Sequence, residues 1–229
     1  GEAMNYSHLK LSGLVVLALL HGCATNVAMT DAERTALKST SGPIQTLLYT
    51  SLGSNGLMIT TYGTAMAGPG AGYVAIKNGK EWTQENNLPH PMVVVRDRLV
   101  GKLKSDLSVY SFKHLDTTLD IGEESPEKLK ARLGSGLVMD FTGTYQVIYY
   151  LAAASKFHMY FNGRARLVRL DDGKIMWVGN CRTDIEDPDN KPSIDDLSAN
   201  QAVRLKQWLG RGAAECSKQL TDQFFGRST

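Results

Sequence analysis

Hydrophobic and polar side chains alternate along the middle of the chain, between residues 157 and 181. This segment, FHMYFNGRARLVRLDDGKIMWVGNC, has two runs rich in β-branched, aromatic and leucine residues on either side of Asp172-Gly173. An Asp-Gly pair readily adopts the positive φ angles of a tight turn, so the pattern predicts a β-hairpin. Counting outward from the turn gives the pairs expected to face each other, which are Leu170 with Ile175 and Val168 with Trp177.

Two arginines occupy alternate positions in the first strand of this hairpin. Arg164 and Arg166 are interleaved with Ala165 and Leu167. Because side chains two residues apart on a strand point to the same face, one face should be apolar and the other should carry both arginines. We expect these arginines to be exposed and to be candidates for contact with a partner.

Further segments show strand or helix periods. The run 136–150 is rich in aromatic and β-branched residues and predicts a long strand, joined by a linker at 151–156 to the hairpin. The run 93–107 places its leucines and valine at helical spacing, which predicts an amphipathic helix. Ser125-Pro126 is a typical helix start, and Gly134 a typical end, so a second helix is expected at 126–133.

The remaining segments give weaker signals. Residues 44–50 fit a first strand or a turn of helix, and residues 31–38 a short helix. A last helix is expected from Ser198 to about Phe225. The glycine-rich run 56–79 is interrupted by Pro69, which argues against a membrane-spanning helix. It predicts either an insertion packed on the sheet or a surface that docks a partner or dips into a membrane.

These elements predict an α+β fold with a mixed, mostly antiparallel sheet, built on a long hairpin meander and covered by helices. The chain has 229 residues, of which 42% are hydrophobic, and this suits a single core. We expect one domain at 44–229, preceded by a tether at 23–43. Residues 1–22 are interpreted as a tag remnant, Gly1–Ala3, followed from Met4 by a lipoprotein signal peptide.

The end of that leader carries a candidate lipidation site. The apolar run LSGLVVLALL at 11–20 is shorter than the ~20 residues that span a bilayer. It leads into Leu20-His21-Gly22-Cys23, which resembles the bacterial lipobox. The resemblance implies cleavage before Cys23, with diacylglyceride and palmitoyl-type N-acyl chains attached to it. The alternative is a secretory signal in which Cys23 is incidental.

The other two cysteines point to an oxidising compartment. In an exported chain Cys181 and Cys216 would more often pair than stay free, so a disulfide is favoured over two buried thiols. No histidine lies near either cysteine in the sequence, so we expect no metal site. The net charge of +2 comes from scattered lysines and arginines, which gives no indication of nucleic-acid binding. Dinucleotide and P-loop spacings both fail, and no cofactor is expected.

Two motifs carry a resemblance to a known group. One is the apolar strand after a small-residue step, GSGLVMDFTG at 134–143, and the other is RLVRLDDGKIMW at 166–177. With the order of elements at 92–185, they resemble the periplasmic α/β domain shared by the curli secretion-channel lipoprotein, the lipoprotein activators of penicillin-binding proteins and the N-terminal domain of the Tol translocation protein B. The resemblance implies a lipid-tethered domain that binds other envelope proteins and is not an enzyme. Ala24, in place of a retaining aspartate, implies the periplasmic side of the outer membrane.

Three functions remain in view. The first is a lipid-anchored accessory or scaffold protein of the cell envelope, acting by protein–protein binding, with its oligomeric state left open. The second is a periplasmic enzyme, although no serine elbow, zinc helix or paired His and Cys nucleophile occurs. The third is a periplasmic small-ligand-binding protein. The enzyme would use Asp140, His158, Asp171 and Asp172, and ligand binding would use Tyr145, Tyr149, Tyr150 and Tyr160.

Overall fold

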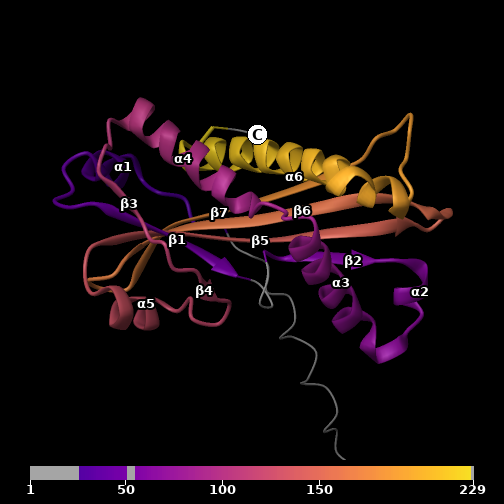
Figure 1. The fold of residues 1–229 in the computed structure, drawn as a ribbon. Coiled ribbons are helices and arrows are strands. Elements are labelled where there is room, and N and C mark those ends of the chain that lie inside the picture. Colours follow the sequence, from indigo (N-terminus) through magenta and orange to yellow (C-terminus); the bar gives the residue numbers. More distant parts are fainter. Residues whose placement is uncertain (1–25, 51–54, 228–229) are drawn as a thin grey trace, which may run out of the picture.

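The computed structural model describes residues 26–50 and 55–227. These residues form one body around a seven-stranded mixed sheet (Figure 1). The main strand order is β3-β1-β5-β6-β7, and β2 and β4 pair at the side with β5 and β1. The strands are β1 (Ile44–Thr50), β2 (Leu57–Thr60), β3 (Phe112–His114), β4 (Leu119–Asp120), β5 (Leu137–Tyr150), β6 (Ala153–Arg169) and β7 (Lys174–Ile185). The predicted α+β class and the three antiparallel strands β5, β6 and β7 are confirmed.

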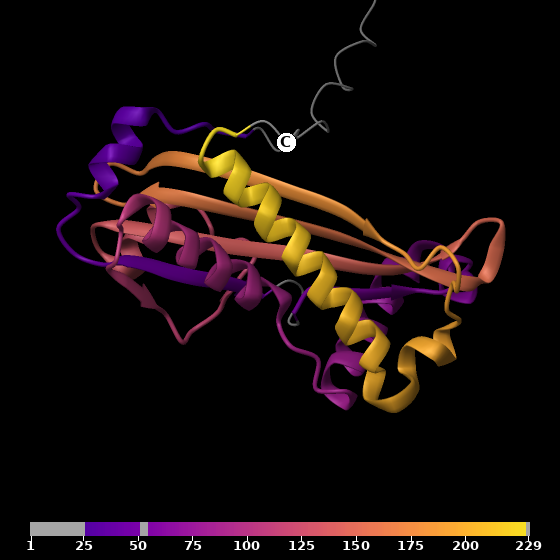
Figure 2. The ribbon, with the colours of Figure 1, turned by 90° about the horizontal axis from the view of Figure 1, so that it is seen from above.

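Helices cover the two faces of the sheet unequally. Two long helices, α4 and α6, lie along one face, and α6 crosses the strands diagonally (Figure 2). The short helix α5 lies at one end of the other face (Figure 1). The helices are α1 (Asp31–Leu37), α2 (Tyr62–Ala65), the 3-10 turn η1 (Gly68–Gly70), α3 (Ala71–Glu85), α4 (Pro91–Leu107), α5 (Pro126–Leu133) and α6 (Ile194–Phe224). No helix in these two described ranges is long and apolar enough to cross a membrane.

Burial follows this arrangement. The main core lies between the sheet and the α4–α6 layer, and it holds Phe161, Trp177 and Trp208, all almost completely buried. A second, smaller core lies beneath α5 and includes Leu129, Val168 and Leu170. The alternation that predicted the strands thus marks which side chains enter the main core.

The register of the hairpin differs from the prediction. The loop between β6 and β7 has four residues, Leu170–Gly173, so Val168 faces Ile175. The register then shifts, and Leu167 faces Trp177. Leu170 is fully buried in the small core instead of pairing across the ladder. Burial of this leucine explains why the loop is longer than a two-residue turn.

The helix starts are confirmed where capping chemistry is clear. The Ser125 hydroxyl accepts a hydrogen bond from the Lys128 N–H at the start of α5, as the sequence predicted. The last helix differs, because Ser193 caps α6 five residues before Ser198. Residues 199–202 depart from helical angles within α6, so the predicted start lies next to a break in the helix.

The glycine-rich run contains β2, α2 and the first part of α3. A Cβ atom on Gly79 would lie 2.0 Å from the carbonyl oxygen of Leu57, and one on Gly56 would lie 2.3 Å from that of Gly143. These two glycines therefore allow α3 and the start of β2 to approach neighbouring backbone closely. The segment is packed on the sheet, which is the first of the two predicted alternatives.

The folded body begins earlier than the predicted boundary at residue 44. Val27 pairs with Val178 of β7 through two backbone hydrogen bonds of 3.0 and 3.1 Å. Met29 and Leu37 are buried in the main core. Residues 27–43 therefore belong to the domain and are not a free tether. The predicted lipidation residue Cys23 and the leader at 1–22 lie outside the described residues.

Candidate functional site

The face of the sheet opposite α4 and α6 carries polar and aromatic side chains, most of which are half-exposed. We call it the open face. On β5 and β6, buried residues alternate with half-exposed residues, because one face packs on the main core and the other does not. The open face consists of Thr142, Thr144, Gln146, Tyr150, His158, Tyr160, Asn162, Arg164, Asn180, Arg182 and Asp184.

A buried ion pair closes one end of the open face. Arg166 on β6 lies opposite Asp140 on β5, and its Nε is 3.0 Å from Asp140 Oδ1. The Tyr49 hydroxyl donates to Asp140 Oδ2 at 3.2 Å. Arg166 also donates to the carbonyl oxygen of Glu124, at 2.7 Å, just before α5. The Glu124 carboxylate in turn pairs with Arg164.

This pair corrects the expectation that Arg166 is exposed. Arg166 is only 7% exposed and Asp140 only 1%. Burial, then the negative charge of Asp140, raises the pKa of Tyr49, so its hydroxyl stays protonated and donates. Burial opposes the charge of Arg166, but the bonds to Asp140 outweigh it and raise the arginine pKa. Arg166 therefore holds α5 to the sheet, and only Arg164 reaches the surface in part.

An aromatic cluster lies at the other end of the open face, and we define it as Tyr150, His158 and Tyr160. The His158 ring stacks on Tyr150 with centroids 4.6 Å apart and meets the edge of Tyr160 at 4.7 Å. His158 Nδ1 is 2.7 Å from a carboxylate oxygen of Asp184. The three rings and Asp184 therefore hold one another in place.

Charged side chains surround these rings. The Lys191 ammonium lies 4.1 Å from the centre of the Tyr150 ring, and the Arg182 guanidinium lies 5.7 Å from the centre of the Tyr160 ring. The Tyr150 hydroxyl donates to Glu186 at 2.7 Å. Partial burial and this carboxylate raise the pKa of Tyr150, which remains a hydrogen-bond donor at neutral pH.

The predicted catalytic residues do not come together. His158 pairs along the sheet with Ile148, eight positions from Asp140, which corresponds to about 27 Å. Asp171 and Asp172 lie in the hairpin turn, and Asp172 bonds to Arg169 at 2.6 Å. In the described ranges 26–50 and 55–227, no group of three or more His, Cys, Asp or Glu residues could hold a metal ion.

The four predicted ligand-binding tyrosines divide between the two faces. Tyr145 is fully buried against Phe161 in the main core, and Tyr149 contacts Tyr62 edge-to-face at 5.7 Å. Only Tyr150 and Tyr160 belong to the open face. Arg182 on the open face was not predicted from the sequence, although the alternation of Asn180, Arg182 and Asp184 could have indicated it. Lys191 and Glu186 were not predicted either, because they belong to a loop that only the fold brings next to the aromatic cluster.

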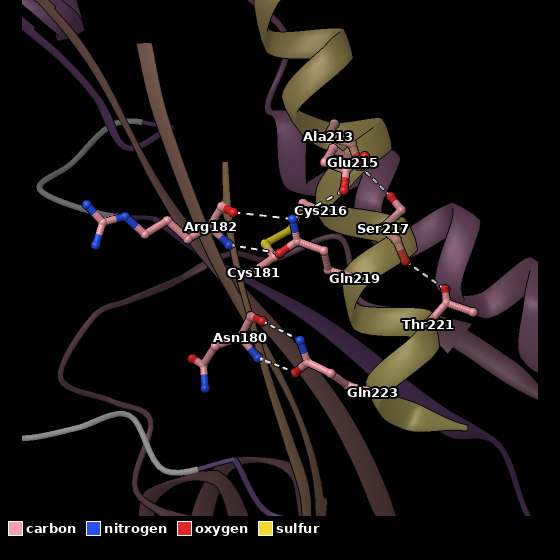
Figure 3. The surroundings of a disulfide bond; sticks show 10 residues. All are labelled: Asn180, Cys181, Arg182, Ala213, Glu215, Cys216, Ser217, Gln219, Thr221 and Gln223. Atoms are coloured by element: carbon pink, nitrogen blue, oxygen red, sulfur yellow. Dashed lines mark hydrogen bonds between the residues drawn. A yellow bond between two sulfur atoms is a disulfide. The ribbon is translucent and has the colours of Figure 1, made fainter. Parts of the chain in front are cut away.

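The predicted disulfide is confirmed. Cys181 on β7 and Cys216 on α6 are joined, with Cα atoms 5.1 Å apart (Figure 3). Both cysteines are buried in the main core. The bond ties the last helix to the edge strand of the sheet, and it suits a compartment in which thiols are oxidised.

Two glutamine side chains of α6 complete the same edge of the sheet. The side-chain amide of Gln223 exchanges two hydrogen bonds with the backbone of Asn180, at 3.0 and 2.7 Å (Figure 3). Gln219 does the same with the backbone of Arg182, at 3.1 and 3.2 Å. Val27 forms backbone hydrogen bonds with Val178 in the same way. The outward backbone groups of alternate β7 residues, at 178, 180 and 182, are therefore already hydrogen-bonded. Strand addition at this part of β7 is therefore blocked.

Comparisons with known proteins find only distantly similar structures. No family model matches the sequence, and no curated protein matches it significantly. The PelC dodecamer from Paraburkholderia phytofirmans is 7% identical, with coverage of 90% of this chain and 97% of that chain and a TM-score of 0.34. Lipoprotein GNA1162 from Neisseria meningitidis is 17% identical, with coverage of 75% and 99% and a TM-score of 0.26. TM-scores this low do not support a transfer of function.

Proposed function

We propose that this chain is a lipid-anchored accessory or scaffold protein of the bacterial cell envelope that acts in the periplasm by binding another envelope protein. The observation that carries the proposal is the aromatic cluster of the open face. Its rings are prearranged and surrounded by Arg182, Lys191 and Asp184. Tyrosine and arginine are the residue types most enriched at the energetic centres of protein interfaces. Arg164 adds a partly exposed cation to the same face.

Export and anchoring belong to the same proposal. The Cys181–Cys216 bond supports an oxidising location, and Cys23 supplies the predicted lipid attachment. The first described residue, Asn26, contacts Asn180 on β7 at 2.8 Å. Only Ala24 and Thr25 lie between it and Cys23 in the sequence, so the domain would lie close to the membrane surface, on the periplasmic side of the outer membrane.

The anchor is tested by Cys23→Ser. We expect this variant to leave the detergent phase in a partition experiment and to appear in the soluble periplasmic fraction. Continued detergent partitioning would assign membrane attachment to another segment. Sucrose-gradient separation of the wild-type protein tests the membrane itself, and a peak with inner-membrane markers would reject outer-membrane placement.

Binding is tested by photo-crosslinking in cells from position 160, with position 110 as the control. Tyr110 is a tyrosine outside the open face and is 70% exposed, so a reactive group there is at least as accessible as one at the half-buried position 160. We expect a cross-linked envelope protein from position 160 only, and its loss when Arg182→Glu is added. A small-molecule adduct instead of a protein would favour the ligand-binding alternative. Full rescue of a deletion strain by Tyr160→Ala with Arg182→Glu would argue against the open face.

A further inference from the structure

A second surface, on the opposite face of the molecule, has the form of a docking groove. Between α4 and α6 lie two adjoining hollows of about 520 and 630 Å³, which share Arg98 and Ala214. We call the combined hollow the helix groove. Along α6 it runs from Gln207 to Asp222, which is about 23 Å at the rise of an α-helix. A helix of about 15 residues has this length.

The floor of the helix groove is made of small residues beside the buried ring of Trp208. On α6 the small residues are Gly210, Ala214, Ser217 and Thr221, at the i, i+4, i+7, i+11 spacing that forms one stripe of a helix. Gly101 stands across from them on α4. Small residues at such positions let a third helix approach closely, within the 8–10 Å interaxial distances of packed helices.

Neither groove glycine is required by the fold. A Cβ atom added at Gly101 or at Gly210 would meet no atom within 4 Å. Both lie in the interior of long helices, where glycine lowers helix stability relative to alanine. Their occurrence on facing sides of one groove is explained if another chain fills the space above them.

The rims of the helix groove carry excess positive charge. Five cationic and two anionic side chains line it, and both carboxylates are already paired, Asp187 with Arg204 and Arg211, and Asp222 with Lys218. Arg227 contacts Asp106 at 3.5 Å. Arg98 and Lys102, on the α4 rim, have no side-chain hydrogen bond or ion pair with any other residue of the described ranges 26–50 and 55–227. An occupant should therefore carry negative charge on the side that faces Arg98 and Lys102 of α4.

We propose that the helix groove binds an acidic amphipathic helix of a partner protein. A helix satisfies its own backbone hydrogen bonds, whereas an extended segment would find no free backbone partner on the sides of α4 and α6. A flat anionic membrane would contact the rims but leave the hollow unfilled. The proposal concerns a different face from the aromatic cluster, so it stands or falls independently of the proposed function.

The test uses the full chain and a synthetic 16-residue helical peptide with alanine along one face and glutamate along its flanks, labelled with fluorescein. Fluorescence anisotropy should show saturable binding that weakens as salt is added. A peptide with lysine in place of each glutamate should not bind. Absence of saturable binding of the glutamate peptide would overturn the proposal.

Variants locate the binding. Gly210→Leu fills the floor, and Arg98→Glu with Lys102→Glu reverses one rim; each should raise the dissociation constant at least tenfold. The matched controls are Gly72→Leu and Lys80→Glu on α3, where an added Cβ at Gly72 also meets open space. Gly210→Ala checks folding and should raise the melting temperature by about 2–4 °C.

Three further outcomes would contradict the proposal. Unchanged affinity in Gly210→Leu would mean that the peptide binds by charge alone and not in the groove. Phosphatidylglycerol vesicles could compete with the peptide for the protein. If Arg98→Glu with Lys102→Glu abolished binding to these vesicles and Gly210→Leu did not, the rims would be a membrane-contacting surface. Dimerisation of the protein that displaces the labelled peptide would instead assign the groove to self-association.

Discussion

At the scale of single residues, the Arg166–Asp140 pair shows how burial changes the role of a charged side chain. Both groups are almost fully removed from water, and their bonds reach Tyr49 and the backbone at Glu124. A buried charge that loses its partner is costly, because neither solvent nor another group compensates it. This pair therefore has a structural role, in contrast to the exposed charges on the same face.

Removal of one partner should destabilise the fold strongly. We expect Arg166→Met or Asp140→Asn to lower the free energy of unfolding by about 3 to 5 kcal/mol in urea denaturation. Arg169→Met is the control, because it breaks only the exposed pair with Asp172 and should cost less than about 1 kcal/mol. An equal loss of unfolding free energy in the Arg169→Met control would show that the buried pair stabilises the fold no more than an exposed pair does.

Asp187 gives a second prediction, on pH. Although burial opposes it, hydrogen bonds from Arg204, Trp208 and Arg211 lower the pKa of Asp187. A carboxyl with a lowered folded pKa stabilises above its ordinary pKa of about 3.9, and this contribution is lost as the pH falls through the lower folded value. We expect Asp187→Asn to cost about 1 to 2 kcal/mol at pH 7 and nothing below the folded pKa.

Urea denaturation across pH 2 to 7 measures this difference. Asp189→Asn, at an exposed neighbour in the same loop, should follow the wild-type curve. A constant gap between the wild-type and Asp187→Asn proteins across the whole range would mean that the loss comes from packing and not from the charge.

At the scale of elements, the edge strand β7 is completed by side chains of α6. Each glutamine amide supplies one donor and one acceptor, which is what a neighbouring strand would offer at the same place. The sheet edge is thereby satisfied without another strand. Natural proteins protect such edges because exposed backbone groups invite pairing with other chains.

Removing these caps should have two effects. We expect Gln219→Ala with Gln223→Ala to lower the free energy of unfolding by about 2 kcal/mol, from about 1 kcal/mol for each glutamine, and to increase self-association seen by light scattering. Gln84→Ala, at an exposed position of α3, is the control and should change neither. A stable, monodisperse double variant would show that water caps this edge equally well.

At the scale of the whole molecule, the sheet separates two surfaces. The open face presents tyrosine, histidine and arginine on one side, and the helix groove lies on the other side, between α4 and α6. Figure 1 shows both of these helices on one side of the sheet. The disulfide joins the layers that form these surfaces, because Cys181 belongs to the sheet and Cys216 to α6. If the proposed function and the proposed helix binding both hold, the domain would bind two partners on opposite faces, as a scaffold does.

The disulfide should matter for the stability of the whole domain. Its two cysteines are 35 residues apart, and closing such a loop stabilises by about 3 to 4 kcal/mol in the chain-entropy model. We expect Cys181→Ala with Cys216→Ala to lose about this amount in urea denaturation. A reductant should destabilise the wild-type protein similarly and leave the double variant unchanged. Insensitivity of the wild-type protein to reductant would contradict the prediction.

The sequence alone determined the elements whose causes are local. Alternation over 136–150 and along β6 required strands, and Ser125 with Pro126 and Gly134 set both ends of α5. Periodicity and capping act over a few residues, so they can be read without the fold. The pairing of Cys181 with Cys216 was also predicted, on the hypothesis that the chain is exported and that Cys23 carries lipid, which leaves two cysteines to pair.

Only the tertiary structure decided which charged residues are buried and which are exposed. The alternation around Arg166 placed it correctly opposite the main core, but a strand pattern does not reveal that α5 and Asp140 cover that end of the face. The hairpin register likewise depended on the small core that takes in Leu170. The aromatic cluster and the helix groove combine residues from strands, loops and helices far apart in the chain. Such meetings are set by packing between elements, for which a single sequence carries no local signal.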